Sequence, residues 1–423
     1  MGDQPLTSAT AGPSAGTGWS PWRTVVAFGL VSLLADMVYE GMRSVAGPYL
    51  GTLGASALVV GLVTGAGEAM ALLLRLGTGP WADRSGRHWR LTVVGYALTA
   101  VCVPLLALAP ALGTAGVAVA AALILAERAG KAIRSPAKSA LLARVAAGGS
   151  LGRAFGVHKA LDQVGAFAGP LVVAGVAALT GVLWPGFAVL AVPGALSLLV
   201  LAQLARRAPV LTAAVVPDES VVVTASEQPN RPARRGLGAA LGVDLPARFH
   251  VFSAAAALAT AGLMTFGIIS FRFVETGLVP LAAAPVVYAL AMATAAVAAL
   301  GTGVVFDRWG PRVLLVVPVL VAVLPPLVFA DRLAPVLAGV ALWGVATGIL
   351  DSTVKAQVAA VVPGSRRATG YGVFAAVQGL GAIAGGVVAG ALVTGHATVL
   401  AVVVALAQVA ALVLLAGVLR TRR

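Results

Sequence analysis

The stretch GTGPWADRSGRH, residues 77–88, recurs far downstream as GTGVVFDRWGPR, residues 301–312. In both copies a Gly-Thr-Gly triplet is followed, at the same spacing, by an Asp-Arg pair and then a glycine. Further matches at nearly the same offset join Ser135-Pro136-Ala137-Lys138 to Ser352-Thr353-Val354-Lys355, and Gly156, Gly165 and Gly169 to Gly372, Gly381 and Gly385. Agreement at nearly the same offset is hard to obtain by chance, so the repeats predict two homologous halves.

The sequence around these motifs is strongly apolar. Hydrophobic residues make up 59% of the 423 residues and charged residues only 10%, which is too little charge to cover a water-soluble fold of this size. Apolar segments of spanning length recur on both sides of a polar stretch. Their approximate bounds are 22–50, 57–76, 91–109, 112–134, 154–179, 182–204, 249–271, 285–306, 313–330, 333–358, 369–393 and 398–419.

These segments predict an all-α polytopic membrane protein with 12 transmembrane helices in two pseudo-symmetric six-helix halves, residues 22–205 and 248–419. Residues 1–21, rich in Gly, Ala, Ser, Thr and Pro, are expected to be a disordered cytoplasmic tail. Residues 206–247 mix charge with proline and are expected to be a flexible cytoplasmic linker. Residues 420–423 form a short cytoplasmic tail.

The distribution of the net charge of +14 predicts how the protein is oriented in the membrane. Arginine and lysine gather in every second loop, in the linker and at the C-terminus, whereas the alternate loops contain only Arg272 and Arg332. By the positive-inside rule this bias predicts a multi-pass protein of the cell (inner) membrane with both termini in the cytoplasm. Anionic lipid is then the expected neighbour of the basic loops. We expect no nucleic-acid partner.

The motif Gly79-x-x-x-Asp83-Arg84-x-Gly86-Arg87-His88 resembles the signature loop between helices 2 and 3 of the major facilitator superfamily. Its echo, with Gly303, Asp307 and Arg308, lies where that family carries a second copy between helices 8 and 9, although Pro311 replaces a basic residue. The resemblance covers residues 22–419 and implies the fold of that family, with these loops acting as a cytoplasmic gate. The alternative is a generic basic turn that only fixes topology.

A second resemblance concerns the fifth predicted helix. Gly165-x-x-x-Gly169-Pro170 is similar to a motif that the same superfamily associates with antiporters and exporters. Small residues permit tight helix crossing, and Pro170 frees a backbone carbonyl and makes the helix easier to bend. The alternative is plain small-residue packing in a chain with 51 glycines.

Charged residues inside the predicted spans are the candidates for chemistry, because each is costly in lipid and normally faces a cavity or a partner. Asp36, Glu40 and Arg43 share one face of the first helix. A carboxylate beside an arginine suits a proton-coupled carrier, and Asp36 lies deepest. The alternative is a structural ion pair between Glu40 and Arg43.

The fourth and fifth helices carry a second group of charges. Arg128 is the nearest match to the superfamily's proton-coupling arginine, and Asp162 is expected to interact with Arg128 or Lys131. The alternative is a charge network that holds the cytoplasmic ends of these helices together. Glu68 and Arg75 share a face of the second helix and either line the cavity or stabilise the bundle.

The second half offers fewer charges. Asp351 and Lys355 are spaced i, i+4 on the tenth helix, and Gln378 occupies the position equivalent to Asp162. These residues are either substrate contacts or, for the charged pair, a local salt bridge. Arg272 and Glu275 are expected to pair at the outer rim.

No pattern in the sequence indicates an enzyme. It has no nucleophile elbow and no Walker-type loop, and its one cysteine and four scattered histidines form no metal-binding motif. We therefore expect a secondary transporter without metal or cofactor, driven by the proton gradient, that exports a small molecule by antiport and alternating access. The alternatives are a proton-coupled importer (symporter) and a non-transporting membrane scaffold or sensor. We expect a monomer.

Overall fold

The computed structural model describes residues 19–146, 151–208, 243–363 and 366–420. Nearly all of the predicted N-terminal tail, most of the predicted linker and the last three residues lie outside the described residues. Within the described ranges all regular secondary structure is helical, which confirms the predicted all-α fold.

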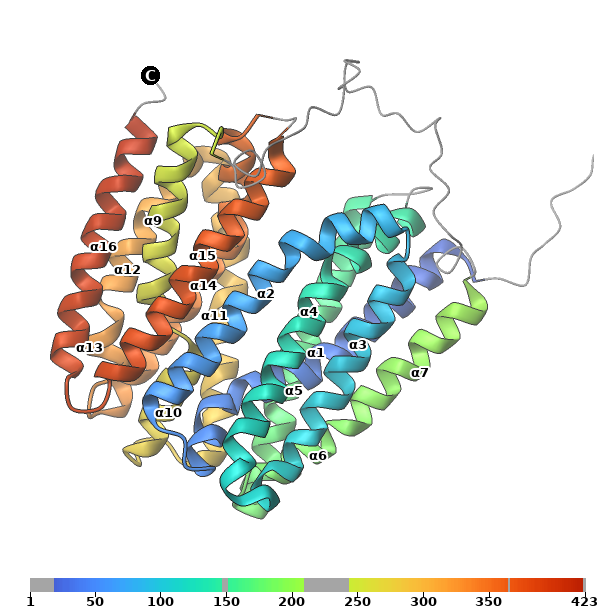
Figure 1. The fold of residues 1–423 in the computed structure, drawn as a ribbon, viewed down its shortest axis with the longest axis horizontal. Helices are drawn as coiled ribbons and strands as arrows, with labels where there is room; N and C mark the ends of the chain where they lie inside the picture. The colour runs from blue at the N-terminus through green and yellow to red at the C-terminus, as the bar shows by residue number, and fades with distance from the viewer. Residues whose placement is uncertain (1–18, 147–150, 209–242, 364–365, 421–423) are drawn as a thin grey trace, which may run out of the picture.

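The first half contains α1 to α7 and one 3-10 helix, η1 (Figure 1). Their bounds are α1 Pro21–Thr52, α2 Ala57–Ser85, α3 His88–Leu105, η1 Leu106–Ala115, α4 Gly116–Ala146, α5 Leu151–Thr180, α6 Trp184–Val189 and α7 Ala191–Arg207. The second half contains α9 Ala247–Leu263, α10 Phe266–Glu275, η3 Leu281–Ala283, α11 Ala284–Trp309, η4 Gly310–Leu315, α12 Val316–Ala322, α13 Leu324–Val328, α14 Leu333–Val361, α15 Arg367–Leu392 and α16 Ala397–Arg420.

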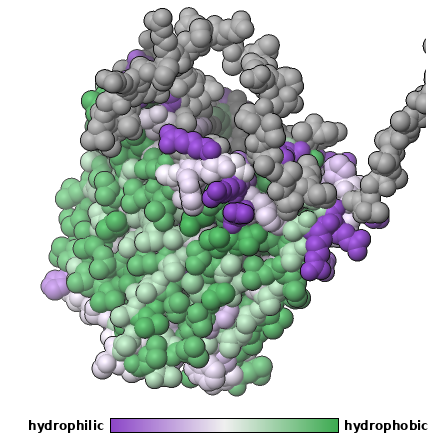
Figure 2. All heavy atoms as spheres, turned by 45° about the vertical axis from the view of Figure 1, so that its right-hand side comes forward, coloured by the Kyte–Doolittle hydropathy of each residue, from purple (hydrophilic) through white to green (hydrophobic). Residues whose placement is uncertain are grey.

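Ten helical runs in the described part are long and apolar enough to cross a membrane. The run His88–Val145 contains both α3 and α4, and the predicted segment 313–330 is formed by η4, α12 and α13. Helices therefore occupy every predicted span. Figure 2 shows the matching surface, apolar over the body of the molecule with hydrophilic residues mainly at one end.

Three predicted spans are broken where the sequence analysis expected continuous helices. Segment 182–204 divides into α6 and α7, segment 313–330 into short pieces, and segment 249–271 into α9 and α10. The break between α9 and α10 falls at Met264, which has φ 59°. Thr265 then has extended backbone and is the N-cap residue that precedes α10. A left-handed φ interrupts the helix, and a non-glycine residue adopts it only at an energetic cost.

Glycines set the same helix packing in both halves. A Cβ on Gly165 or Gly169 of α5 would overlap a carbonyl oxygen of α1, and a Cβ on Gly381 or Gly385 of α15 would overlap a carbonyl oxygen of α9. Close backbone approach of this kind is how helices pack in lipid. The repeat read from the sequence therefore corresponds to a repeated helix–helix contact.

The two halves lie side by side, with α2 and α15 running along their boundary (Figure 1). We call the end that carries the α2–α3 turn and the C-terminal end of α16 the basic face, and the opposite end the far face. Backbone contacts near the far face join α1 to α10 at Gly47 and Gly267, and α2 to α15 at Gly61 and Gly386. The helices of the two halves thus meet closely toward the far face.

Candidate functional site

Four charged residues of the first half and one tyrosine of the second meet between α1, α2, α4 and α11. Glu40 and Arg43 come from α1, Glu68 from α2, Arg128 from α4 and Tyr288 from α11. We call these five residues the central cluster. Its members are buried or half-buried inside membrane-spanning helices, where charges are stable only with partners.

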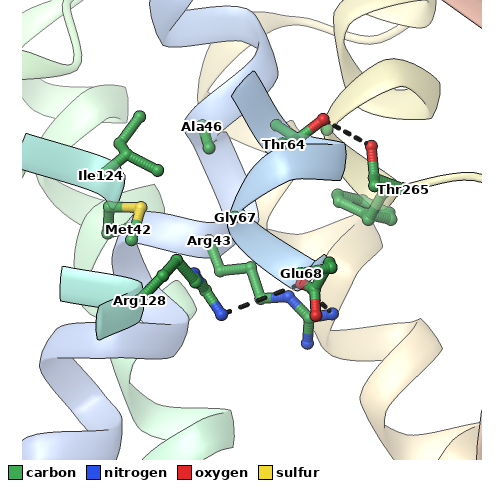
Figure 3. Close-up of a pocket in the computed structure, with 11 residues that line it drawn as sticks. Met42, Arg43, Ala46, Thr64, Gly67, Glu68, Ile124, Arg128 and Thr265 are labelled. Carbon is green, nitrogen blue, oxygen red and sulfur yellow. Dashed lines mark hydrogen bonds and ion pairs between the residues drawn. The ribbon is translucent and has the colours of Figure 1, made fainter. Parts of the chain in front are cut away.

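Glu68 is the hub of the central cluster (Figure 3). Its Oε1 lies 2.9 Å from Nη2 of Arg43 and 3.8 Å from Nη1 of Arg128. The Glu68 side chain is 31% exposed, whereas that of Arg128 is 4% exposed. The carboxylate that neutralises two arginines is therefore also the one that a proton or a ligand can reach.

Tyr288 links the central cluster to the second half of the molecule. Its hydroxyl accepts a hydrogen bond from Nη1 of Arg43 at 3.1 Å and donates one to Oε2 of Glu40 at 2.5 Å. Glu40 and Arg43 are also paired at 3.7 Å, as the sequence predicted. Arg43 lies closer to Glu68, however, so the pair within α1 is one part of a larger network.

Arg128 is held from several sides. It donates to the Tyr39 hydroxyl, and its Nε lies 3.4 Å from Oε2 of Glu127. The Glu127 side chain is fully buried and accepts a hydrogen bond from Thr99 at 3.1 Å. This network fixes the guanidinium of Arg128 against α1 and α3.

A hollow lies on the side of the central cluster toward α10 (Figure 3). It is lined by residues of α1, α2, α4 and the start of α10, namely Met42, Arg43, Ala46, Thr64, Gly67, Glu68, Ile124, Arg128, Thr265, Phe266 and Gly267. The Thr64 and Thr265 hydroxyls are 2.7 Å apart and join the two halves at its edge. The site is therefore polar at one side and bordered by the second half at the other.

Asp36 and Asp162 lie apart from the central cluster, toward the basic face. Asp36 pairs with Arg134 at 3.3 Å. Asp162 lies 3.8 Å from Lys138 and 3.7 Å from His158. The expectation that Asp162 interacts with Arg128 or Lys131 is wrong, because its ionic partners are Lys138 of α4 and His158, one turn away on α5.

The candidates in the second half are dispersed. Gln378 donates to the Thr260 hydroxyl of α9 at 3.1 Å. Asp351 is exposed on α14, and the side chain of Lys355 lies outside the described residues, so their pairing stays a prediction. Arg272 and Glu275 pair at 3.1 Å at the end of α10, as expected for the rim.

The proposed gating loop is a helix end followed by a tight turn. The motif up to Ser85 belongs to α2, and Gly86 ends that helix with φ 61° while its N–H donates to the carbonyl of Ala82. Gly310 has φ 63° at the matching place in the second half. Both turns need glycine for this backbone conformation.

Only some side chains of the proposed gating loop are described. Arg84 and Arg87 are exposed or half-exposed on the basic face, as is Arg308 in the second copy. The side chains of Asp83 and Asp307 lie outside the described residues, as do the surroundings of Gly79 and Gly303. The gate role stays a prediction.

Of the central cluster, Tyr288 was not predicted, and Glu68 was predicted only as a residue that either lines the cavity or stabilises the bundle. Glu68 carried the signal of an acid embedded in a span, but its partners are on α1 and α4 and become visible only in three dimensions. Tyr288 carried no signal, since a tyrosine in an apolar helix is common. Arg43, Glu40 and Arg128 were predicted and are brought together.

Comparisons with known proteins agree with the fold. A family model described as Major Facilitator Superfamily matches residues 27–331. Uncharacterized proteins of Mycobacterium tuberculosis and Mycobacterium bovis are 45% identical over 397 residues, covering 94% of this chain and 93% of each relative.

Solved structures are similar at lower identity. The nucleoside transporter NupG is 16% identical with a TM-score of 0.70, covering 94% of this chain and 98% of its own. A POT family transporter in complex with 5-aminolevulinic acid is 13% identical with a TM-score of 0.74, covering 95% and 97%. At these identities the likeness extends to the fold and not to the substrate.

Proposed function

Since this chain belongs to the Major Facilitator Superfamily, a superfamily of membrane transporters, we propose that it couples the movement of a small molecule to that of protons at the central cluster. The observation that carries the proposal is the position of Glu68, a half-exposed carboxylate held between Arg43 and Arg128 inside the membrane. A proton on Glu68 would remove the charge that neutralises both arginines. Proton binding would therefore change how the cluster holds a ligand and its own helices together.

Alternating access gives this change a mechanical consequence. The two halves of such carriers rock about a site at their boundary. Glu40 and Arg43 of the first half bond to Tyr288 of the second half. A change of charge in the central cluster thus acts on a contact between the halves, which is the requirement for coupling to a conformational change.

Export by antiport is the direction that the helix-5 motif favours. In such a cycle, proton and substrate occupy the cluster alternately. The structure adds that Gly165 and Gly169 pack α5 against α1, and the same packing recurs at Gly381 and Gly385 without a following proline. The direction of transport therefore rests on the sequence resemblance.

A symporter is the second candidate, favoured by the two arginines around Glu68. If the substrate bears a negative charge, a proton on Glu68 frees the guanidinium groups for it. Proton and substrate then bind together and move in the same direction.

The test is proton flux in reconstituted vesicles with panels of anionic, cationic and neutral small molecules, comparing wild type with Glu68→Gln. We expect substrate-dependent proton movement that Glu68→Gln abolishes and that Glu275→Gln, a change at the exposed rim, leaves intact. Flux that survives in Glu68→Gln but is lost in Asp36→Asn would move the coupling to the Asp36–Arg134 pair. Substrate movement with no proton movement in wild type would refute the coupling itself.

A further inference from the structure

We propose that the transported molecule is an anion, carrying a carboxylate or phosphate group, which binds to Arg75 and Lys131 beside the central cluster. This inference rests on the proposed function, because it assigns a substrate class to the neighbourhood of the same cluster. The cations of the first half differ in how they are partnered.

Lys131 contacts the aromatic ring of Tyr39 and not a carboxylate. Its Nζ lies 3.5 Å from the centroid of the Tyr39 ring, and no carboxylate of the described residues is within ion-pair distance of it. The neighbouring cations of α4 are all paired, Arg128 with Glu68 and Glu127, Arg134 with Asp36 and Lys138 with Asp162. Lys131 therefore stands out among the cations of α4.

Arg75 on α2 is in a similar position. Its Nε is buried and has no hydrogen-bond partner among the described atoms. It interacts electrostatically with Tyr39 and Glu68 in its own half and with Asp351 across the boundary, but no ion pair of described residues includes it. A buried guanidinium N–H without a hydrogen-bond acceptor is costly, and a ligand that accepts a hydrogen bond from it removes that cost.

Arg75 and Lys131 lie at the same level of two adjacent helices. The Thr78 hydroxyl, one turn from Arg75, donates to the carbonyl of Ala132, the residue after Lys131, at 3.1 Å. Lys131 lies over the Tyr39 ring, and Tyr39 interacts electrostatically with Arg75. This common level on adjacent helices is the basis for assigning one small anion to both groups.

The nearby carboxylates do not satisfy these cations. Glu40 bonds to Tyr288, Glu68 to Arg43, and Glu127 to Thr99. Arg43, Arg75, Arg128 and Lys131 share this region with Glu40, Glu68 and Glu127, and Asp351 of α14 interacts electrostatically with Arg75. An anionic ligand is therefore favoured by the two cations that lack a carboxylate or an acceptor of their own, Lys131 and the Nε of Arg75, and not by an excess of positive charge.

The proposed charge of the substrate determines how it is linked to the proton. A proton on Glu68 would make the cavity more positive and would strengthen the binding of an anion. Binding of the two is then mutually reinforcing, as linkage requires, so an anionic substrate favours the symport candidate over antiport.

The experiment is a melting-temperature titration of the detergent-solubilised protein at constant ionic strength. The anionic probes are inorganic phosphate, sulfate and glutarate, with choline as the cationic probe and adenosine as the neutral one. We expect a saturable rise with at least one anion, because a ligand that binds only the folded state stabilises it. Arg75→Gln and Lys131→Gln should each weaken that binding about tenfold or more, whereas Lys131→Arg and the rim change Arg272→Gln should retain it.

Three outcomes would overturn the proposal. They are saturable stabilisation by choline or adenosine alone, no saturable effect of any anion, or an anion effect that persists in the Arg75→Gln/Lys131→Gln double variant. The vesicle assay separates this failure from that of the proposed function. Proton-linked flux of a cation would refute the proposal of an anionic substrate and support proton coupling. Anion binding and transport without proton movement would refute proton coupling and support the anionic substrate.

Discussion

Glu127 shows what a buried charge costs at the scale of one residue. Its carboxylate is fully buried and faces Arg128, which is 4% exposed. Glu127→Ala removes one partner of this pair and also the acceptor of the Thr99 hydrogen bond. Removing one partner of a buried ion pair costs about 3–5 kcal/mol, so we expect a marked fall in the melting temperature in detergent.

A matched change in the same measurement is Glu275→Ala, which breaks the exposed Arg272 pair and should cost less than about 1 kcal/mol. Glu127→Gln should fall between the two, because an amide oxygen still accepts from Thr99. Equal melting temperatures for Glu127→Ala and Glu275→Ala would show that Arg128 finds another partner, and that the network around it is redundant.

Tyr288 is the residue through which the second half contacts the central cluster. Tyr288→Phe removes the hydrogen bonds to Arg43 and Glu40 and keeps the ring packed 4.7 Å from that of Phe266. Hydrogen bonds to charged groups contribute about 1.5–3 kcal/mol. We therefore expect proton-linked transport in vesicles to fall about tenfold or more.

The control for that variant is Tyr49→Phe, which removes the hydroxyl that donates to the Leu106 carbonyl within the first half. It should lower stability without lowering the ratio of protons to substrate. If Tyr288→Phe transported with the coupling of wild type, the hydroxyl would be a packing contact and not part of the coupling.

The sequence predicts pairs along one helix better than pairs between helices. Glu40 and Arg43 lie one turn apart, so helical geometry alone places them together. Glu68, by contrast, contacts Arg43 of α1 and Arg128 of α4, and Asp162 contacts Lys138 where Arg128 or Lys131 was expected. Both cases depend on the rotation and depth of neighbouring helices, which a single sequence does not specify.

At the scale of the element, α5 allows packing to be tested with a control on the same helix. A Cβ on Gly169 would overlap the carbonyl oxygen of Met37, whereas a Cβ on Gly175 would meet no atom within 4 Å. Gly169→Ala should therefore force α1 and α5 apart and lower the melting temperature. Gly175→Ala should be neutral or stabilising by up to about 1 kcal/mol, because alanine favours helix.

The outcome also bears on the helix-5 motif. If Gly169→Ala folds as stably as Gly175→Ala but loses transport, the motif acts in the transport cycle. If both stability and transport fall, and Gly385→Ala behaves in the same way against Ala261 of α9, the glycines serve packing in both halves.

Helix positions were predictable from the sequence, but helix continuity was not. Hydropathy locates every span, because an apolar run of the required length in a chain this poor in charge is typical of a membrane-crossing helix. The break at Met264 was not predicted, because the residue with positive φ is neither proline nor glycine and Gly262, two residues before it, is one of many glycines in these spans.

At the scale of the whole molecule, the two halves share their packing but divide the chemistry. Glycines place α5 on α1 and α15 on α9 in the same way. Among the described residues, however, every ion pair within the spans other than that at the rim belongs to the first half. The second half contributes Tyr288, Thr265 and the apolar wall. The repeat thus corresponds to the helix packing, whereas the ion pairs of the described spans lie almost entirely in one half.

The contact that closes the far face provides a test of alternating access for the whole molecule. Gly61 of α2 and Gly386 of α15 approach so closely that a Cβ on either would overlap a backbone carbonyl of the other helix. Backbone atoms cannot move aside as a flexible side chain can, so Gly61→Leu should prevent the two halves from meeting there. The conformation seen in this structure should lose population, and the far face should open.

A cysteine at position 64 can report that opening, because Thr64 lines the hollow and its hydroxyl contacts that of Thr265 in the second half. The Thr64→Cys variant is made in a chain in which the buried Cys102 is replaced by alanine. In intact cells, a membrane-impermeant maleimide should label it slowly in the wild-type background and at least about tenfold faster with Gly61→Leu. Gly77→Leu is the matched control on the same helix, since a Cβ there meets no atom within 4 Å. Fast labelling both with and without Gly61→Leu would mean either that the far face is already open or that the basic face is on the outside of the cell. Labelling of inverted membrane vesicles separates these two cases. Equally slow labelling in both would show that α2 and α15 do not control access from the far face.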